Sequence, residues 1–101
     1  MSRAATGSAL DGLDPILNAP KRLAIMAVLE GSQFAEFGFL RDHLAVSDSD
    51  LSKQAATLEA AGYLTIRKSG RGRGGLTSYQ ATAAGTAAYR RHRDALRAML
   101  G

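Results

Sequence analysis

The sequence predicts a small, mainly helical domain that contains one β-hairpin, an α+β fold. Apolar residues recur at helical spacing in three stretches before Gly62. Strand-forming residues then flank a glycine-rich loop, and helical spacing returns in the last part of the chain. The 101 residues have a composition typical of globular proteins, so we expect a single domain.

Start and stop signals predict the limits of the first three helices. Pro20 begins the first helix, because proline suits the first helical turn. The second helix is expected over residues 36–46. Ser47 is placed to cap the third, with Asp50 three residues later in a capping-box arrangement, and Gly62 ends that helix.

The hairpin and the last helix follow in the same way. Residues 63–66 and the run that begins at Leu76 are rich in strand formers. Between them, residues 69–75 read SGRGRGG and predict a flexible loop. Thr82 is placed to cap a final helix of about residues 83–100.

The first residues differ in character from the rest. Residues 1–12 are small and polar, so we expect a flexible arm, with the domain formed by residues 13–101. This arm lacks the apolar segment of a secretion signal. No apolar run approaches the roughly 20 residues of a membrane helix. We therefore expect a cytoplasmic protein without a membrane partner.

Positive charge is concentrated in one third of the chain. The formal net charge is +4, and residues 67–97 contain eight basic residues against the single acidic Asp94. Such asymmetry favours a face that meets a polyanion, although a merely solvated basic face would give the same count.

The sequence contains little that indicates an enzyme or a metal-binding protein. The chain has no cysteine, and its two histidines, His43 and His92, are far apart in sequence, so ligands for a metal are lacking. Residues 70–75 formally match G-x-G-x-x-G, but a strand rather than a helix is expected to follow them. We expect neither an enzyme nor a cofactor.

Two short helices joined by a tight turn and followed by a hairpin form a winged helix-turn-helix, in which one helix fits the major groove of DNA. On the third helix, Leu51, Ala55 and Leu58 share the buried stripe. The recognition helix, about residues 48–61, then offers polar side chains to double-stranded DNA: Ser49, Ser52, Lys53, Gln54 and Thr57. The wing, at residues 69–75 and the strand before it, offers Arg67, Lys68, Arg71 and Arg73 to the backbone or minor groove.

Two other binding functions stay open. A winged helix can serve as a protein-protein adaptor, which would favour an apolar recognition face or an uncharged wing. An Arg-Gly segment can bind RNA, although such segments usually lie in long disordered tracts.

The segment LSKQAATLEAAGYLTIRK, the Gly/Arg hairpin and SYQATAAG together resemble the winged-helix transcriptional regulators related to MarR. The matching positions are Leu58-Glu59, Gly62-Tyr63 and Thr82 with Gly85. The resemblance covers roughly residues 13–100 and implies homodimers held by terminal helices and sequence-specific operator binding as a repressor. It places Ser52, Lys53 and Gln54 toward DNA and Arg71 and Arg73 at the wing. Family members often carry a basic residue where Ala56 stands.

A homodimer is also favoured by the apolar spacing of the ends of the chain. In the last helix, side chains at 3-and-4 spacing form a seam, and leucines near the N-terminus exceed what a small core covers. The alternative is that this helix only folds back on its own core. The residues expected at the dimer interface are Leu13, Leu17, Tyr89, His92, Leu96, Met99 and Leu100.

Overall fold

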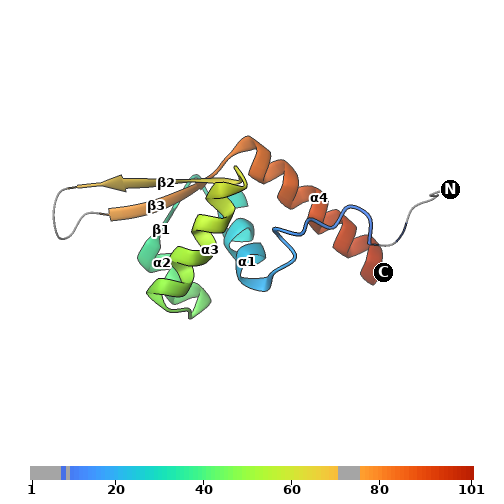
Figure 1. Cartoon of the computed structure of the whole chain (residues 1–101), viewed down its shortest axis with the longest axis horizontal. Helices are drawn as coiled ribbons and strands as arrows, with labels where there is room; N and C mark the ends of the chain where they lie inside the picture. Colours follow the sequence, from blue (N-terminus) through green and yellow to red (C-terminus); the bar gives the residue numbers. More distant parts are fainter. Residues whose placement is uncertain (1–7, 9, 71–75) are drawn as a thin grey trace.

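The computed structural model describes residues 8, 10–70 and 76–101. They form four helices and a small antiparallel sheet, which confirms the predicted mainly helical fold with a hairpin (Figure 1). In chain order the elements are α1 (Pro20–Glu30), β1 (Ala35–Glu36), α2 (Phe37–Leu44), α3 (Asp48–Ala60), β2 (Leu64–Ser69), β3 (Leu76–Ala81) and α4 (Ala83–Leu100). None of the helices within these residues is long and apolar enough to cross a membrane.

The sheet has a third strand that the sequence pattern did not reveal. Its order is β1-β3-β2, and the two-residue β1 pairs Ala35 with Tyr79 and Glu36 with Ser78. The helix predicted to start at residue 36 therefore begins one residue later. The first hairpin strand extends further than predicted, because β2 continues to Ser69, which still pairs with Leu76.

The predicted starts of α3 and α4 and the predicted end of α3 are confirmed, whereas α2 ends at Leu44, two residues earlier than predicted. The Ser47 hydroxyl accepts a hydrogen bond from the Asp50 backbone N–H at 3.1 Å, and the Thr82 hydroxyl accepts one from the Gly85 N–H at 2.9 Å. Gly62 follows α3 with a φ of +80°, a left-handed conformation that glycine adopts without strain. These caps satisfy N–H groups that have no partner inside their helix.

The hydrophobic core lies between the helices and the sheet face that carries Leu64 and Tyr79. Each strand contributes alternate residues to this inner face, as the two-residue period of a strand requires. The fully buried side chains include Ile25 and Met26 of α1, Leu40 of α2, and Leu51 and Leu58 of α3. The core thus fixes α3 beneath the sheet (Figure 1).

The end of α3 and the start of α4 meet in a close backbone contact. Tyr63, between α3 and β2, accepts a hydrogen bond from the Thr82 N–H through its carbonyl oxygen at 3.1 Å. An ideal Cβ on Gly85 would lie 1.9 Å from that same oxygen. Only glycine therefore fits at position 85.

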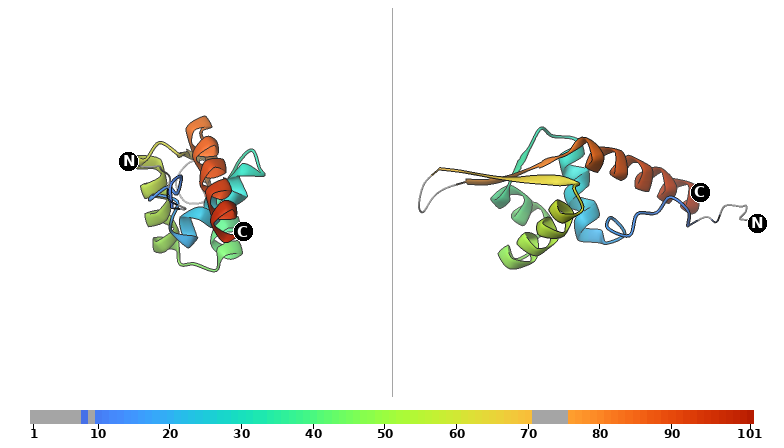
Figure 2. Two further views of the ribbon diagram at one scale, coloured as in Figure 1. Left: turned by 90° about the vertical axis from the view of Figure 1, so that its right-hand side faces the viewer. Right: turned by 45° about the horizontal axis from the view of Figure 1, so that its top comes forward.

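The segment before α1 runs alongside α4 and covers one of its faces (Figure 2). The Asp14 backbone N–H donates to Nδ1 of His92 at 2.9 Å, and the Tyr63 hydroxyl donates to the Asp14 carboxylate. These bonds join the segment, the end of α3 and α4. The hydrogen bond to Asp14, followed by burial, raises the pKa of the Tyr63 hydroxyl above its ordinary value.

Two of the residues expected at the dimer interface are part of the protomer's own packing. Leu17 and His92 are both 0% exposed. Leu17 belongs to the hydrophobic core, and His92 is covered by the segment that contains Asp14. Neither side chain is accessible to a second copy of the chain in this conformation, so their burial within the protomer argues against their assignment to the interface.

Candidate nucleic-acid interface

The outward face of α3 consists of small and polar residues. Leu51, Ala55 and Leu58 are buried, as the helical spacing predicted. The opposite side is free of bulky apolar groups and exposes Ser49, Ser52, Lys53, Ala56 and Ala60. A helix with short exposed side chains approaches another surface closely, which suits the width of a major groove.

Two of the five predicted recognition residues are less exposed than the others and form hydrogen bonds within the protein. Gln54 and Thr57 are half-buried. The Thr57 hydroxyl donates to the Lys53 carbonyl oxygen one turn earlier, at 3.2 Å. Gln54 accepts from Nη1 of Arg22 at 2.9 Å and donates to Oδ1 of Asp50 at 3.0 Å. The Gln54 carboxamide thus forms part of the contact between α1 and α3.

Asp50 lies at the centre of this contact. Its carboxylate accepts from Gln54 and forms an ion pair with Lys21 of α1. The hydrogen bond from Gln54, then that from Lys21, lowers the pKa of the Asp50 carboxyl below its ordinary value. The predicted capping box is therefore half present: Ser47 caps the helix, while Asp50 binds α1.

The two predicted wing residues within the described chain lie on opposite faces of the sheet. Lys68 shares its face with Leu64 and Ile66, because alternate residues of a strand point the same way. This is the side on which α2 and α3 lie (Figure 1). Arg67 belongs to the outer face and pairs across the strands with Ser78. Arg71 and Arg73 lie outside the described residues, as does most of the predicted loop.

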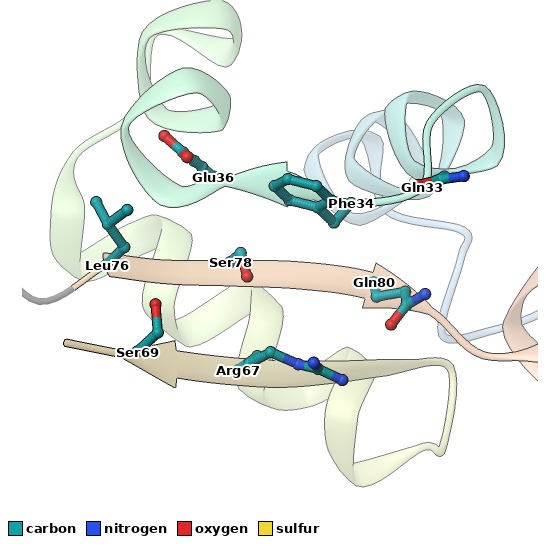
Figure 3. Close-up of a pocket in the computed structure, with 8 residues that line it drawn as sticks. All are labelled: Gln33, Phe34, Glu36, Arg67, Ser69, Leu76, Ser78 and Gln80. Carbon is teal, nitrogen blue, oxygen red and sulfur yellow. The ribbon is translucent and has the colours of Figure 1, made fainter.

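The outer face of the sheet is hollowed around Arg67 (Figure 3). The hollow measures about 470 Å³ and has apolar walls formed by Phe34 and Leu76, which are 56% and 54% exposed. Glu36 lies at its edge, so one cation and one carboxylate border the same space. Phe34 was absent from the sequence-based candidates, because nothing in its neighbourhood distinguishes a wall residue from a core residue.

The basic third of the chain does not form one face. Arg67 and Lys68 lie on the wing, whereas four arginines lie on α4, which extends away from the wing (Figure 1). Two of those four are paired: Arg90 Nε lies 3.1 Å from the Glu30 carboxylate and Arg93 Nε lies 3.2 Å from that of Asp94. The charge count alone therefore does not locate the surface that meets a polyanion.

A family model described as "Winged helix DNA-binding domain" matches residues 21–100. The chain belongs to this winged-helix family. A transcriptional regulator homologue protein from Pyrococcus horikoshii has the same fold, with a TM-score of 0.78 and 26% sequence identity. The alignment covers 84% of each chain.

Two further proteins are similar to the chain, one in fold and one in sequence. The zinc-responsive MarR family member ZitR of Lactococcus lactis shares the fold, with a TM-score of 0.66 and 11% identity over 93% of this chain and 62% of its own. An uncharacterized protein of Methanocaldococcus jannaschii is 33% identical over 54 residues, 54% of this chain. The chain spans 59% of the length of that relative. The winged-helix fold that the resemblance implies is thus confirmed.

Within the winged-helix fold, α2 and α3 form the helix-turn-helix and β2 with β3 form the wing. The sequence pattern predicted the exposed face of α3 and the wing. It missed the contribution of α1, since Lys21 and Arg22 reach α3 across 29 and 32 positions of the chain. A basic pair at the start of a buried helix gives no local signal for such contacts.

Proposed function

We propose that this winged-helix protein is a regulator of transcription that binds double-stranded DNA sequence-specifically as a homodimer, in the manner of a repressor. The observation that carries the proposal is the exposed, small-residue face of α3 beneath the Lys68 face of the wing. In a domain of this family, such a helix lies in the major groove while the wing reaches the backbone or the minor groove.

Ser49, Ser52 and Lys53 are the residues proposed to contact the duplex through α3. Their side chains are exposed, and the Lys53 ammonium has no ion pair among the described residues. Lysine and serine hydrogen-bond to base edges or phosphates, depending on depth in the groove. Gln54 is proposed to act chiefly in holding α3, because both ends of its amide are already bonded.

On the wing, Lys68 is proposed as the main phosphate contact within the described strands, because it lies on the same side as α3. Arg67 would have to bend around the edge of β2 to reach that side. The predicted roles of Arg71 and Arg73 remain part of the proposal, although these residues lie outside the described chain.

The dimer is proposed to form at the α4 end, remote from the wing. Leu10, Met99 and Leu100 are 62%, 37% and 78% exposed. An ideal Cβ on Gly12 would lie 3.2 Å from the Ala95 Cβ, which places the segment with Leu10 and Leu13 against α4. Leu13, Tyr89 and Leu96 are half-buried beside them. A second copy would cover this apolar surface.

Selection of bound sequences from a random duplex library tests the proposal. We expect an inverted repeat, with half-sites about one helical turn apart, about 34–36 Å. Lys53→Ala should change the selected bases, since a good base contact contributes roughly 1–3 kcal/mol of discrimination. Lys68→Ala is the matched control and should bind more weakly while selecting the same sequence. A Lys53→Ala protein that selects the wild-type sequence with the wild-type preference would show that α3 does not read bases.

A further inference from the structure

Helix α3 carries an unusual charge for an element placed in a DNA groove. Its 13 residues include three acidic residues, Asp48, Asp50 and Glu59, and one basic residue, Lys53. Two of these carboxylates lie in the first turn, near the end of a recognition helix that reaches the bases. Uncompensated, they would repel the phosphates on both sides of the groove.

Each first-turn carboxylate is paired with a cation from a neighbouring helix. Arg41 of α2 places Nη1 3.2 Å from Oδ1 of Asp48. Lys21 of α1 forms an ion pair with Oδ2 of Asp50. Arg41 is shared with Asp42 of its own helix, whose Oδ1 lies 3.0 Å from Arg41 Nε, so it compensates Asp48 only in part. Among the described residues, Lys21 pairs with Asp50 alone.

The two pairs differ in their exposure to solvent. The Asp48 side chain is 69% exposed, so water and salt screen it strongly. The Asp50 side chain is 24% exposed and also accepts from Gln54. Gln54 in turn is held by Arg22, whose Nε donates to the Ile16 carbonyl oxygen at 2.6 Å. Asp50 is therefore the more firmly positioned of the two carboxylates.

The Lys21 side chain is more exposed to solvent than that of its partner, Asp50. Its side chain remains 52% exposed, at the N-terminal end of α1 and beside the first turn of α3. A lysine carries its charge on a flexible four-carbon stem, so its ammonium has several ångströms of reach once it is released. The ion pair with Asp50 is the contact that keeps this cation against α3.

Resting on the proposed function, we infer that Lys21 is a latent phosphate-contacting residue of the DNA interface and that Asp50 holds it back. With the pair intact, α1 adds neither a phosphate contact nor a repulsive charge. Removing Asp50 alone would release a cation toward the duplex. Removing Lys21 alone would expose an anion there. The two substitutions should therefore change the affinity for duplex DNA in opposite directions. If the pair had only a structural role, both substitutions would weaken binding.

Affinity for one duplex, measured over a range of salt concentrations, tests this inference with D50N, K21A and the double variant. We expect D50N to bind about three- to tenfold more tightly, with a log–log salt slope steeper by about 0.9, the value for one added phosphate contact. K21A should bind a few-fold more weakly. The double variant should return to within about twofold of wild type, because the change removes both opposing charges. The asparagine side chain in D50N retains an oxygen for the hydrogen bond from Gln54, and thermal unfolding verifies that each variant is folded.

The matched control is E59Q, which removes one negative charge from the other end of the same helix and releases no lysine. It should change affinity less than twofold and leave the slope unaltered. An E59Q effect as large as that of D50N would overturn the inference, because any lost charge would then suffice. A double variant as tight as D50N would also overturn it, because the tighter binding would then not depend on Lys21. A wild-type protein that binds no duplex would overturn the proposed function as well, whereas wild-type binding with an unaltered D50N affinity would overturn this inference alone.

Discussion

Helices α3 and α4 carry opposite charge patterns, and the contrast shows how little a charge count says about a binding face. Helix α4 has four arginines and one acidic residue, whereas α3 has three acidic residues and one lysine. Yet α3 has the exposed small-residue face beneath the wing, and half of the α4 arginines are ion-paired. The shape of a face and the cations left free on it are better guides than net charge.

The contact that joins these two helices should be the most sensitive point of the fold. Gly85→Ala would bring a Cβ within 1.9 Å of the Tyr63 carbonyl oxygen, so the backbones must separate. We expect a loss of about 3 kcal/mol or more in the free energy of unfolding. Chemical denaturation measures it. Gly31→Ala, whose Cβ would lie 3.8 Å from the nearest atom, should change it by about 0.5 kcal/mol at most, and equal effects for both would contradict the close contact.

If α4 forms the dimer interface while α3 binds DNA, a charge introduced at the exposed end of α4 should separate the protomers. Leu100 is 78% exposed, so Leu100→Glu leaves the core intact. We expect light scattering to give a dimer mass for wild type and a monomer mass for Leu100→Glu at micromolar concentration. Arg97→Glu, a charge change on the same helix, should remain dimeric. A monomeric wild type would refute the dimer, and a dimeric Leu100→Glu would place the interface elsewhere.

A smaller loss of stability is expected at the hydrogen bond between Asp14 of the N-terminal segment and Tyr63 at the end of α3. Tyr63→Phe removes the hydrogen bond to Asp14 and should cost about 1 kcal/mol of folding free energy. Because the pKa of Tyr63 is raised in the folded protein, this stabilisation is fully present below the ordinary value of 10.0 and is lost as the pH rises through the raised value. The difference from wild type should therefore shrink at strongly alkaline pH. Tyr89→Phe should have little effect, and a Tyr63→Phe loss that does not vary with pH would argue against this bond.

The parts of the fold that could be predicted from sequence depend on local chemistry. Ser47 and Thr82 cap helices through their own side chains, and Gly62 takes the left-handed conformation that ends α3. His92 shows the limit of such reasoning. Its 3-and-4 spacing with Tyr89 and Leu96 indicated a shared face, but the cover of that face comes from Asp14, 78 positions away.

The candidate site shows the same division between local and distant signals. Helical spacing placed Ser52 and Lys53 on the exposed side of α3, where the structure has them. The opposite faces of Arg67 and Lys68 follow from the two-residue period of a strand, once the length of β2 is known. The Lys21–Asp50 pair joins α1 and α3 across 29 positions of the chain, so no local sequence pattern predicts it.

The salt dependence of duplex affinity in two charge-matched double variants tests the central contrast most directly. Lys53→Ala with Lys68→Ala removes two free cations from α3 and the wing, and Arg91→Ala with Arg97→Ala removes two exposed cations from α4. We expect the first variant to bind more weakly and its log–log slope to flatten by at least about 0.9, the value for the Lys68 phosphate contact, while the α4 variant keeps the wild-type affinity and slope. A flattened slope in the α4 variant, with an unchanged slope in the Lys53→Ala/Lys68→Ala variant, would place the DNA at α4. That result would contradict binding through α3 and the wing.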